Sequence, residues 1–425
     1  MLLSLPDWLA HLERLHPKGE RGIELGLERV VRVQAALGQV QHCPVIIVGG
    51  TNGKGSTCAF LEAFYRAAGY RVGCYTSPHL LDYNERVRID GVPIDDESLC
   101  AAFARVEAAR QVAGAVALTY FEFGTLAAWE AFAAARIEVA ILEVGLGGRL
   151  DAVNAYAPDC AIVTGIALDH TAWLGTTREA IGFEKAGIYR AGKPAICADG
   201  DAPQSLLAHA TNIAADLHLV GRDYTLTPTE SGWSLSSRFG VLNDLPRPAL
   251  VGDYQLGNAA AALLAVQALQ ARLPVAVSAM QTALRIVRLP GRFEQVSERP
   301  AVFLDVAHNP QALAALARNL DAQPVRGRTL AVVGMLSDKD IPGALAALAG
   351  KVDVWLLAAL DVPRGASVAV LESAVAGLGG RVESFASPEQ AFQQAVGLAG
   401  GDDRIAAFGS FYTVAAVRRF LQNRE

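Results

Sequence analysis

Short runs of apolar, largely β-branched residues recur along the first half of the chain, and segments with helical spacing separate most of them. The runs that predict buried strands are residues 45–48, 71–79, 138–144, 160–166 and 194–198. Apolar residues recur with the period of a helix in segments 56–68, 95–112, 119–135 and 176–190. Strands that alternate with helices of this length are typical of a parallel sheet covered by helices.

Other segments of this half break the alternation. Residues 1–40 contain two stretches of helical apolar spacing, and the charged segment 80–92 predicts a loop. Residues 218–252 alternate apolar and polar positions between turn residues, which predicts a small antiparallel excursion. Residues 253–271 are rich in alanine and leucine, which predicts a long helix that is buried on most sides.

A second alternating series begins after residues 289–294, which predict a hinge. Its strands are expected at 302–306, 329–335, 352–358, 381–385 and 405–408, and its helices at 311–320, 344–349, 367–378, 389–398 and 414–421. The series has the size of an ordinary domain. The fold class is therefore α/β: a parallel-sheet domain with a small antiparallel excursion over residues 1–290, then a smaller Rossmann-like α/β domain over 291–425.

Composition and charge argue against several classes of function. The chain has 425 residues, 52% of them hydrophobic, and a net charge of −6 without a basic block. That charge argues against binding to nucleic acid or to an anionic membrane surface. The six cysteines form no CxxC pair, the first residues lack a signal-peptide pattern, and no long apolar run occurs, so we expect a reduced, cytoplasmic protein without a membrane span.

The glycine-rich segment 45–57 is the strongest local signal. An apolar strand, a turn with four glycines and a helix follow one another, so the backbone N–H groups at the helix start can bind an anion. Lys54 would add a positive charge beside the β- and γ-phosphates. The strict P-loop pattern differs, because it has glycine where Val48 stands and Ser or Thr where Gly55 stands. The alternative is a tight βα turn, which four glycines around one lysine argue against.

Polar residues follow the predicted strands at their carboxyl ends, where ligands bind in open α/β sheets. In the first domain these are Ser77, Glu143 and the pair Asp169–His170, and oxygen and imidazole ligands of this kind suit Mg²⁺ beside a triphosphate. Asp169 and His170 are alternatives for one ligand position. From the sequence alone, Lys185 is best interpreted as a solvated lysine on a helix.

The second domain has comparable residues at its strand ends. Arg292 lies in the predicted hinge, and Asp305, His308, the segment 337–340 and Ser410 follow three strands. Each could instead be an ordinary capping or turn residue. Their shared position favours a cleft that faces the first domain.

Ten motifs along nearly the whole chain resemble one branch of the ATP-dependent muramyl ligase superfamily, the folylpolyglutamate and dihydrofolate synthetases. They lie at residues 25–29, 50–56, 76–80, 120–125, 142–151, 168–171, 184–188, 290–292, 305–310 and 408–410. The glycine motif at 142–151 and the sequence Asp-Val-Ala-His-Asn-Pro at 305–310 are the most specific.

The resemblance implies a nucleotide site, a metal site and a modified lysine. It implies ATP contacts at Thr51, Asn52, Gly53, Lys54, Gly55, Ser56, Asn258, Arg292 and Asp305. It implies two Mg²⁺ ions on Ser77, Glu143 and His170, and a carbamate on Lys185 as a further carboxylate ligand. Lys54, Lys185 and His308 are the implied catalytic residues.

The resemblance also implies the substrates. Dihydropteroate or a reduced folate is expected at Gly22, Ile23, Glu24, Leu25, Thr119, Tyr120, Phe121, Glu122, Leu150, Asp151 and Ala152, and L-glutamate at His308 and Ser410. ATP would activate the pteroate carboxylate as an acyl phosphate, which the glutamate amine attacks. We expect a monomer that makes dihydrofolate and also extends folate polyglutamates.

Three alternatives stay open at this point. A monofunctional folylpolyglutamate synthase would share the glycine loop and the metal ligands. A P-loop phosphotransferase or NTPase usually has Ser or Thr at the position of Gly55 and Asp at the position of Glu143. A nucleotide-binding scaffold without turnover would have no need for a complete ligand set.

Overall fold

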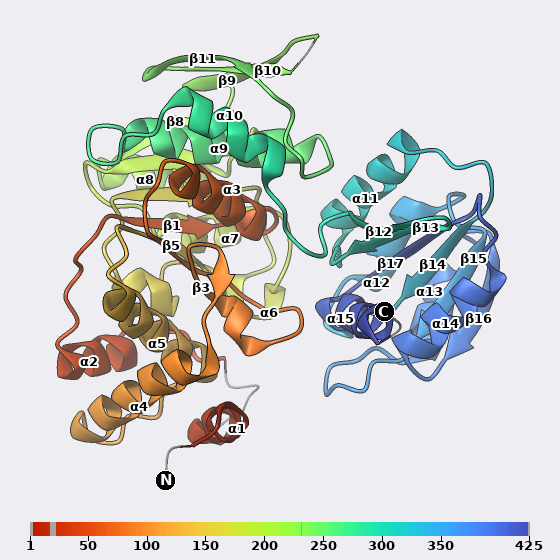
Figure 1. Ribbon diagram of the computed structural model, residues 1–425, viewed down its shortest axis with the longest axis horizontal. Coiled ribbons are helices and arrows are strands. Elements are labelled where there is room, and N and C mark those ends of the chain that lie inside the picture. The colour runs from red at the N-terminus through yellow and green to blue at the C-terminus, as the bar shows by residue number, and fades with distance from the viewer. Residues whose placement is uncertain (1–2, 18–22, 231, 424–425) are drawn as a thin grey trace. The chain divides into compact units, whose positions relative to one another are not determined.

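The computed structural model describes residues 3–17, 23–230 and 232–423, and the chain folds as two compact units (Figure 1). The first unit comprises residues 1–249 and 256–287, and the second comprises 250–255 and 288–425. The predicted α/β class is confirmed, since each unit has its own sheet of mainly parallel strands. None of the described helices combines the length and the apolar character that a membrane-spanning helix requires.

The first unit is built on an eight-stranded sheet. Its strands run in the order β4 (Val92–Pro93), β3 (Val87–Ile89), β2 (Val72–Tyr75), β5 (Val139–Glu143), β1 (Val45–Gly49), β6 (Cys160–Val163), β7 (Pro194–Cys197) and β8 (Asp216–Leu219). The six strands from β2 to β8 are parallel. β1 and β5 are buried along their whole length, which explains why their sequences are nearly all apolar.

The prediction of a loop at 80–92 is wrong. This segment contains a 3₁₀ turn, Tyr83–Arg86, and the antiparallel edge strands β3 and β4. Arg88 lies in β3, yet its guanidinium is largely buried because it pairs with the Glu62 carboxylate at 2.9 Å. The charged residues of this segment therefore led to the prediction of a loop, although the arginine of the strand is paired with a residue elsewhere in the chain.

Ten helices of the first unit are described. They are α1 (Leu5–Leu15), α2 (Glu28–Leu37), α3 (Lys54–Ala67), α4 (Asp96–Val112), α5 (Tyr120–Ala135), α6 (Thr171–Leu174), α7 (Arg178–Ala186), α8 (Gln204–Asn212), α9 (Tyr254–Ala268) and α10 (Val277–Ile286). The sequence pattern did not predict α6, α8 and α10. Thr119 begins α5 with a capping box, since its side chain accepts from the Glu122 N–H while the Glu122 carboxylate accepts from the Thr119 N–H.

The predicted antiparallel excursion is also confirmed. Strands β9 (Tyr224–Pro228), β10 (Trp233–Ser237) and β11 (Gly240–Leu245) form a separate three-stranded sheet. Trp233 anchors it, because its ring is buried and its indole N–H donates to the Pro246 carbonyl at 2.9 Å.

The second unit is built on a six-stranded sheet in which the last strand of the chain lies between the second and third strands of the unit. Its strands run β12 (Glu294–Glu298), β13 (Ala301–Asp305), β17 (Arg404–Phe408), β14 (Thr329–Val333), β15 (Val354–Ala358) and β16 (Arg381–Phe385), and all but β12 are parallel. The predicted hinge ends where β12 begins. The helices are α11 (Pro310–Ala322), α12 (Ile341–Leu345), α13 (Val368–Val375), α14 (Pro388–Leu398) and α15 (Phe411–Gln422).

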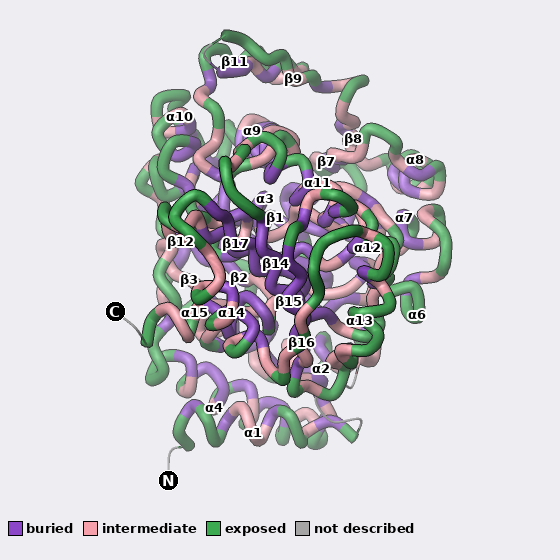
Figure 2. Tube along the Cα trace, turned by 90° about the vertical axis from the view of Figure 1, so that its right-hand side faces the viewer, coloured by how far each residue is buried: buried purple, intermediate pink, exposed green. Residues whose placement is uncertain are grey.

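Burial follows this architecture. The central strands β14, β15 and β17 are buried at every position, as the purple trace shows in Figure 2. Trp355 fills the core of the unit, and its indole N–H donates to the Gly379 carbonyl at 2.8 Å. The apolar runs of the sequence thus become the sheet interior.

Asp403 organises the turn before β17. Its carboxylate accepts from the Arg328 N–H at 2.6 Å, from the Arg328 guanidinium at 2.8 Å and from the Gly400 N–H at 2.9 Å. Burial raises the pKa of Asp403, but these donors outweigh burial and lower the pKa to about 2. The charged form therefore stabilises the folded unit.

We expect Asp403→Asn to lower the free energy of unfolding by about 1–3 kcal/mol at neutral pH, since three donors lose a charged acceptor. The folded pKa lies below the unfolded value of about 3.9, so the contribution is complete above that value and disappears as the pH falls toward 2. Denaturant titrations at several pH values should show the two proteins converging in acid. Asp402→Asn is the matched control, because Asp402 is 65% exposed and pairs only loosely with Arg299, at 3.3 Å. A constant difference between Asp403→Asn and the unchanged protein down to pH 2 would contradict this prediction.

Candidate active site

The glycine-rich loop has the geometry of an anion cradle. Gly50 and Gly53 have φ angles of +139° and +94°, and α3 begins immediately afterwards at Lys54, two residues earlier than predicted. A Cβ atom on Gly53 would lie 2.4 Å from Oδ1 of Asn258, so this asparagine lies directly against the loop. The Lys54 ammonium donates to the carbonyls of Gly50 and Thr51, both at 3.1 Å, and therefore lies over the loop.

The loop that follows β6 holds the glycine-rich loop in place. The Thr51 N–H donates to the Gly165 carbonyl at 2.8 Å, and the Thr51 hydroxyl bonds both to the carbonyl and to the N–H of Ala167 at 3.1 Å. Thr164 donates from its hydroxyl to the Asn52 carbonyl at 2.7 Å. The two loops thus behave as one unit at the carboxyl ends of neighbouring strands β1 and β6.

Two of the predicted metal ligands are in contact. The Ser77 N–H donates to Oε2 of Glu143 at 3.2 Å, and Glu143 is only 5% exposed at the end of β5. His170 follows β6 at the same edge of the sheet and is exposed. It begins α6 with a left-handed φ of 51°, and its N–H donates to the Asp169 carboxylate at 2.8 Å.

The chemistry of these residues fits a hard divalent cation. The described residues contain no cluster of three or more His, Cys, Asp or Glu side chains that could hold a metal ion. The predicted set has only two such side chains, Glu143 and His170, and a serine hydroxyl. Such a set suits Mg²⁺ beside a nucleotide, since phosphate oxygens and water usually complete its coordination.

Lys185 is not the solvated lysine that its helix suggested. It is 4% exposed, and burial, together with the charge of Lys54, lowers the pKa of its ammonium to about 7. Asp151 and Asp169 act in the opposite direction. Burial likewise raises the pKa of Asp151 to about 7, although its carboxylate accepts from the N–H groups of Leu146 and Val153.

The described parts of the three segments predicted to bind pteroate come together. The Arg29 guanidinium bonds to the carboxylate of Glu24 at 2.6 Å and to that of Glu122 at 2.8 Å, which ties segment 23–25 to the first turn of α5. The Gly26 N–H donates to the Leu150 carbonyl at 3.2 Å and adds the third segment. Gly22 lies outside the described residues. Arg29 joins these segments, but it was not among the predicted site residues, although it lies within the motif at residues 25–29.

The side chains along these segments divide into buried and accessible. Thr119, Glu122, Asp151 and Ala152 are buried, whereas Ile23, Glu24, Leu25, Tyr120, Phe121 and Leu150 are half-buried. Gly145 lies under the Phe121 ring, because a Cβ atom there would come within 2.8 Å of it. The apolar residues of the second group are therefore only partly covered.

In the second unit, the predicted residues gather at the carboxyl ends of β13 and β17. The buried Asp305 carboxylate accepts from the N–H groups of Phe293 at 2.9 Å and Ala307 at 2.8 Å. Burial raises the pKa of Asp305 to about 6, while the charge of Arg292 opposes the shift. Arg292 also lies over the ring of Phe411, 5.4 Å from its centroid.

His308 and Ser410 lie on neighbouring loops of this edge. Nδ1 of His308 bonds to the Val306 carbonyl at 2.8 Å, and the Gly409 N–H donates to the Ala307 carbonyl at 3.1 Å. The Ser410 hydroxyl is buried and accepts from the Thr413 N–H at 3.0 Å as the N-cap of α15. The predicted site residues therefore form one group in each unit, with Asn258 in the first and Arg292 and Asp305 in the second.

We expect Gly53→Ala to weaken binding of an ATP analogue by about 10-fold or more, because the new methyl group meets Asn258 and forces a left-handed alanine. Isothermal titration calorimetry with the non-hydrolysable analogue AMPPNP measures this. Gly257→Ala is the matched control, since a Cβ atom there meets nothing within 4 Å although the residue adjoins Asn258. Equal affinities of the two variants would rule out this role of the Gly53 conformation.

Comparison with known proteins extends these observations. The Mur ligase, glutamate ligase domain family matches residues 291–411. Dihydrofolate synthase/folylpolyglutamate synthase of Escherichia coli K12 is 46% identical over 421 residues, which cover 99% of this chain and 96% of that protein. Among solved structures, E. coli FolC in complex with DHPP and ADP superposes with a TM-score of 0.93, with 46% identity and 99% and 98% of the two chains covered.

A further solved structure is similar over the same length. Bifunctional folylpolyglutamate synthase/dihydrofolate synthase from Yersinia pestis, complexed with AMPPNP and a Mn ion, has a TM-score of 0.91 and 45% identity, with 99% and 98% of the chains covered. The resemblance that the sequence motifs indicated is confirmed by relatives that match along almost the entire chain. The chain belongs to the dihydrofolate synthase/folylpolyglutamate synthase family.

Proposed function

We propose that this protein is an ATP-dependent ligase that joins L-glutamate to dihydropteroate and to reduced folate glutamates. One observation carries the proposal: this family member combines a glycine loop in cradle geometry with a buried Glu143 carboxylate, which accepts from the Ser77 N–H, and a buried Lys185. Each of these features suits phosphoryl transfer from a metal-bound nucleotide to a carboxylate.

Amide formation needs activation, because a carboxylate would have to expel oxide when an amine attacks it. ATP transfers its γ-phosphoryl group to the pteroate carboxylate, which gives an acyl phosphate and ADP. The neutral amine of L-glutamate then attacks the acyl carbon, phosphate leaves, and a proton is released. Because an acyl phosphate hydrolyses in water, the site must exclude solvent during the reaction.

The first unit is proposed to bind the nucleotide phosphates and the acceptor. Thr51 to Ser56 offer backbone N–H groups, and Lys54 places a positive charge where charge develops on the leaving ADP oxygens. Ser77, Glu143 and His170 would hold Mg²⁺, which neutralises phosphate charge when bound. The segments joined by Arg29 would hold the pteroate, with Phe121 against its rings and Asp151 as a buried polar contact.

Residues of the second unit are proposed as contacts for ATP and for L-glutamate. Arg292 supplies a planar cation and Asp305 a buried carboxylate, which suit phosphate and hydroxyl groups respectively. His308 and Ser410 are the proposed glutamate contacts. In this proposal residues 1–290 bind ATP and pteroate, residues 291–425 bind the amino acid, and the enzyme acts as a monomer.

Lys185 is proposed to act as a carbamate. Carbon dioxide reacts only with a neutral amine, and the lowered pKa leaves a large neutral fraction at pH 7 to 8. Carbamylation converts a buried cation into an anion, which suits a neighbourhood that already contains the charge of Lys54. The modified lysine would then join Glu143 and Ser77 as an oxygen ligand.

The direct test measures ADP release from ATP with dihydropteroate and L-glutamate present or omitted. We expect release to require both, and dihydrofolate to appear in equal amount, because acyl phosphate formation and amine attack are coupled. Tetrahydrofolate with L-glutamate should also react. Product from tetrahydrofolate but none from dihydropteroate would leave a monofunctional folylpolyglutamate synthase, and ADP release indifferent to glutamate would favour a phosphotransferase or NTPase. Glu143→Gln serves as the inactive control, since it removes a charged metal ligand.

Carbamylation makes a separate prediction with a spectroscopic readout. With ¹³C-bicarbonate, the unchanged protein should show a carbamate carbon signal by NMR that grows from pH 6 to pH 8, as the Lys185 amine loses its proton around pH 7. Lys185→Ala should lose the signal and about 100-fold in kcat, with partial rescue by formate or acetate, as expected for a lost metal ligand. Lys193→Ala is the control, because Lys193 is 47% exposed and pairs with Asp159. A Lys185→Ala protein with normal turnover would exclude a role for the carbamate.

A further inference from the structure

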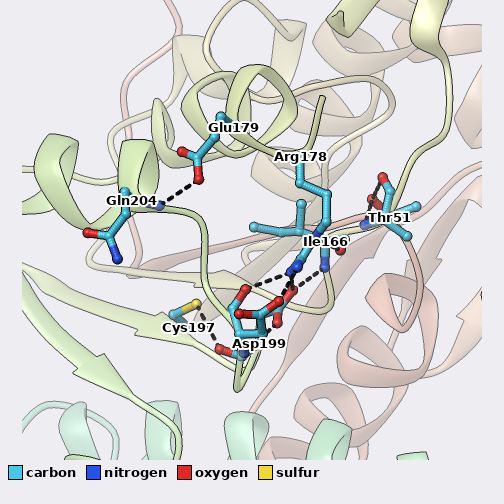
Figure 3. A network of polar contacts seen from close by, with 9 residues as sticks. Thr51, Ile166, Arg178, Glu179, Cys197, Asp199 and Gln204 are labelled. Atoms are coloured by element: carbon cyan, nitrogen blue, oxygen red, sulfur yellow. Dashed lines mark hydrogen bonds and ion pairs between the residues drawn. The ribbon is translucent and has the colours of Figure 1, made fainter. Parts of the chain in front are cut away.

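An arginine–aspartate pair binds both backbone polar groups of one residue, Ile166, in the loop after β6 (Figure 3). The Arg178 Nε–H donates to the Ile166 carbonyl at 3.1 Å, and the Ile166 N–H donates to Oδ2 of Asp199 at 2.8 Å. The pair is closed by Nη2 of Arg178, which donates to the same carboxylate oxygen at 3.1 Å. Ile166 is therefore clamped between a cation and an anion from two other elements.

Further hydrogen bonds hold Arg178 and Asp199 in place. Asp199 follows β7 and also accepts from the Asp201 N–H at 2.9 Å, while Arg178 donates to the Asp201 carbonyl at 2.7 Å and pairs with its carboxylate. The next residue, Glu179, accepts from the N–H groups of Gln204 at 3.1 Å and Ser205 at 2.8 Å. The first turn of α7 is thereby fixed to the first turn of α8, and Arg178 projects from a rigid support.

The clamped loop has two connections to the candidate site. Immediately before and after Ile166, Gly165 and Ala167 make the three hydrogen bonds that hold Thr51 in the glycine-rich loop. Four residues after Ile166, His170 adopts a left-handed φ of 51°. For a residue other than glycine this conformation costs free energy, which contacts of the surrounding structure offset.

The two carboxylates that pair with Arg178 differ in exposure. The Asp201 side chain is 90% exposed, so its ion pair adds little to the free energy of folding, whereas the Asp199 side chain of the clamp is only 12% exposed. A guanidinium donates in several fixed directions within one plane, so it can bind a carbonyl and a carboxylate together. A lysine in its place could keep the charge but could not hold both partners in this arrangement.

We propose that Arg178, fixed by Asp199, is a positioning residue that sets the place of His170 and Thr51 and thereby the affinity for the metal–nucleotide complex. Arg178 is not among the residues proposed to contact ATP, Mg²⁺ or the substrates. The inference rests on the proposed function only for the role given to His170 and Thr51.

The test measures binding of Mn²⁺ with AMPPNP by calorimetry, with melting temperature and the KM for L-glutamate recorded for each variant. We expect Arg178→Gln to weaken binding about 10-fold, the lower end of what loss of a supporting contact costs a metal site, with the KM for L-glutamate unchanged. Arg178→Lys should recover only part of the loss. Arg222→Gln is the matched control, since Arg222 also pairs with an aspartate of the same unit, Asp223, and is 57% exposed.

A double-mutant cycle with His170→Ala separates positioning from general weakening. If Arg178 acts through the loop that carries His170, the loss caused by Arg178→Gln should shrink to about threefold or less in the His170→Ala background, because the two changes then share one effect. In the electron paramagnetic resonance spectrum of bound Mn²⁺, the nitrogen coupling of His170 should also weaken in Arg178→Gln. Fully additive losses would overturn the inference.

Asp199→Asn provides a second route if Arg178→Gln does not fold. This change keeps the size of the side chain and removes the charge that orients Arg178, so binding should weaken as in Arg178→Lys. A folded Asp199→Asn or Arg178→Gln that binds Mn²⁺ and AMPPNP as tightly as Arg222→Gln would overturn the inference. Because binding is measured without turnover, a protein that lacks ligase activity but shows these losses would contradict the proposed function alone.

Discussion

The structure of the candidate site depends on the hydrogen bonding between two loops at the carboxyl ends of β1 and β6. The glycine-rich loop gains its shape from backbone angles that only glycine adopts easily, and such a loop needs external support. Thr164, Gly165 and Ala167 supply that support through main-chain and hydroxyl contacts with Thr51 and Asn52. The parallel sheet makes this possible because it brings the ends of distant strands to one edge.

Burial of charge is the second constraint on this edge. Glu143 and Lys185 are each about 5% exposed or less, and a buried charge is costly unless a partner or a bound ion compensates it. Their neighbours include Lys54, Asp151 and the Ser77 N–H, so charges of both signs meet within the first unit. An ionic ligand such as a metal-bound triphosphate would relieve the cost, which is why burial and the proposed chemistry agree.

Much of the fold could be predicted from the sequence, and the exceptions have a common cause. Apolar runs such as 45–48 and 329–335 predicted strands, and the strands found there, β1 and β14, are buried at every position. The strand that contains Arg88 was missed because its arginine is neutralised by Glu62, 26 residues away along the chain. Lys185 was misjudged for the same reason, since helical periodicity shows the face of a helix but not what covers it. Arg29 and Arg178 act through partners that no local pattern indicates.

The sequence by itself determined the α/β class, the glycine-rich loop with Lys54, and the family, because strand periodicity, glycine content and specific motifs are local properties. Only the tertiary structure decided which charges are buried, which loops support one another, and that Asp199 and Arg178 hold the loop before His170. These features depend on residues that are far apart in sequence and become neighbours only when the strands align. Their energies come from solvent exclusion and from three-dimensional hydrogen-bond geometry, which a linear pattern does not contain.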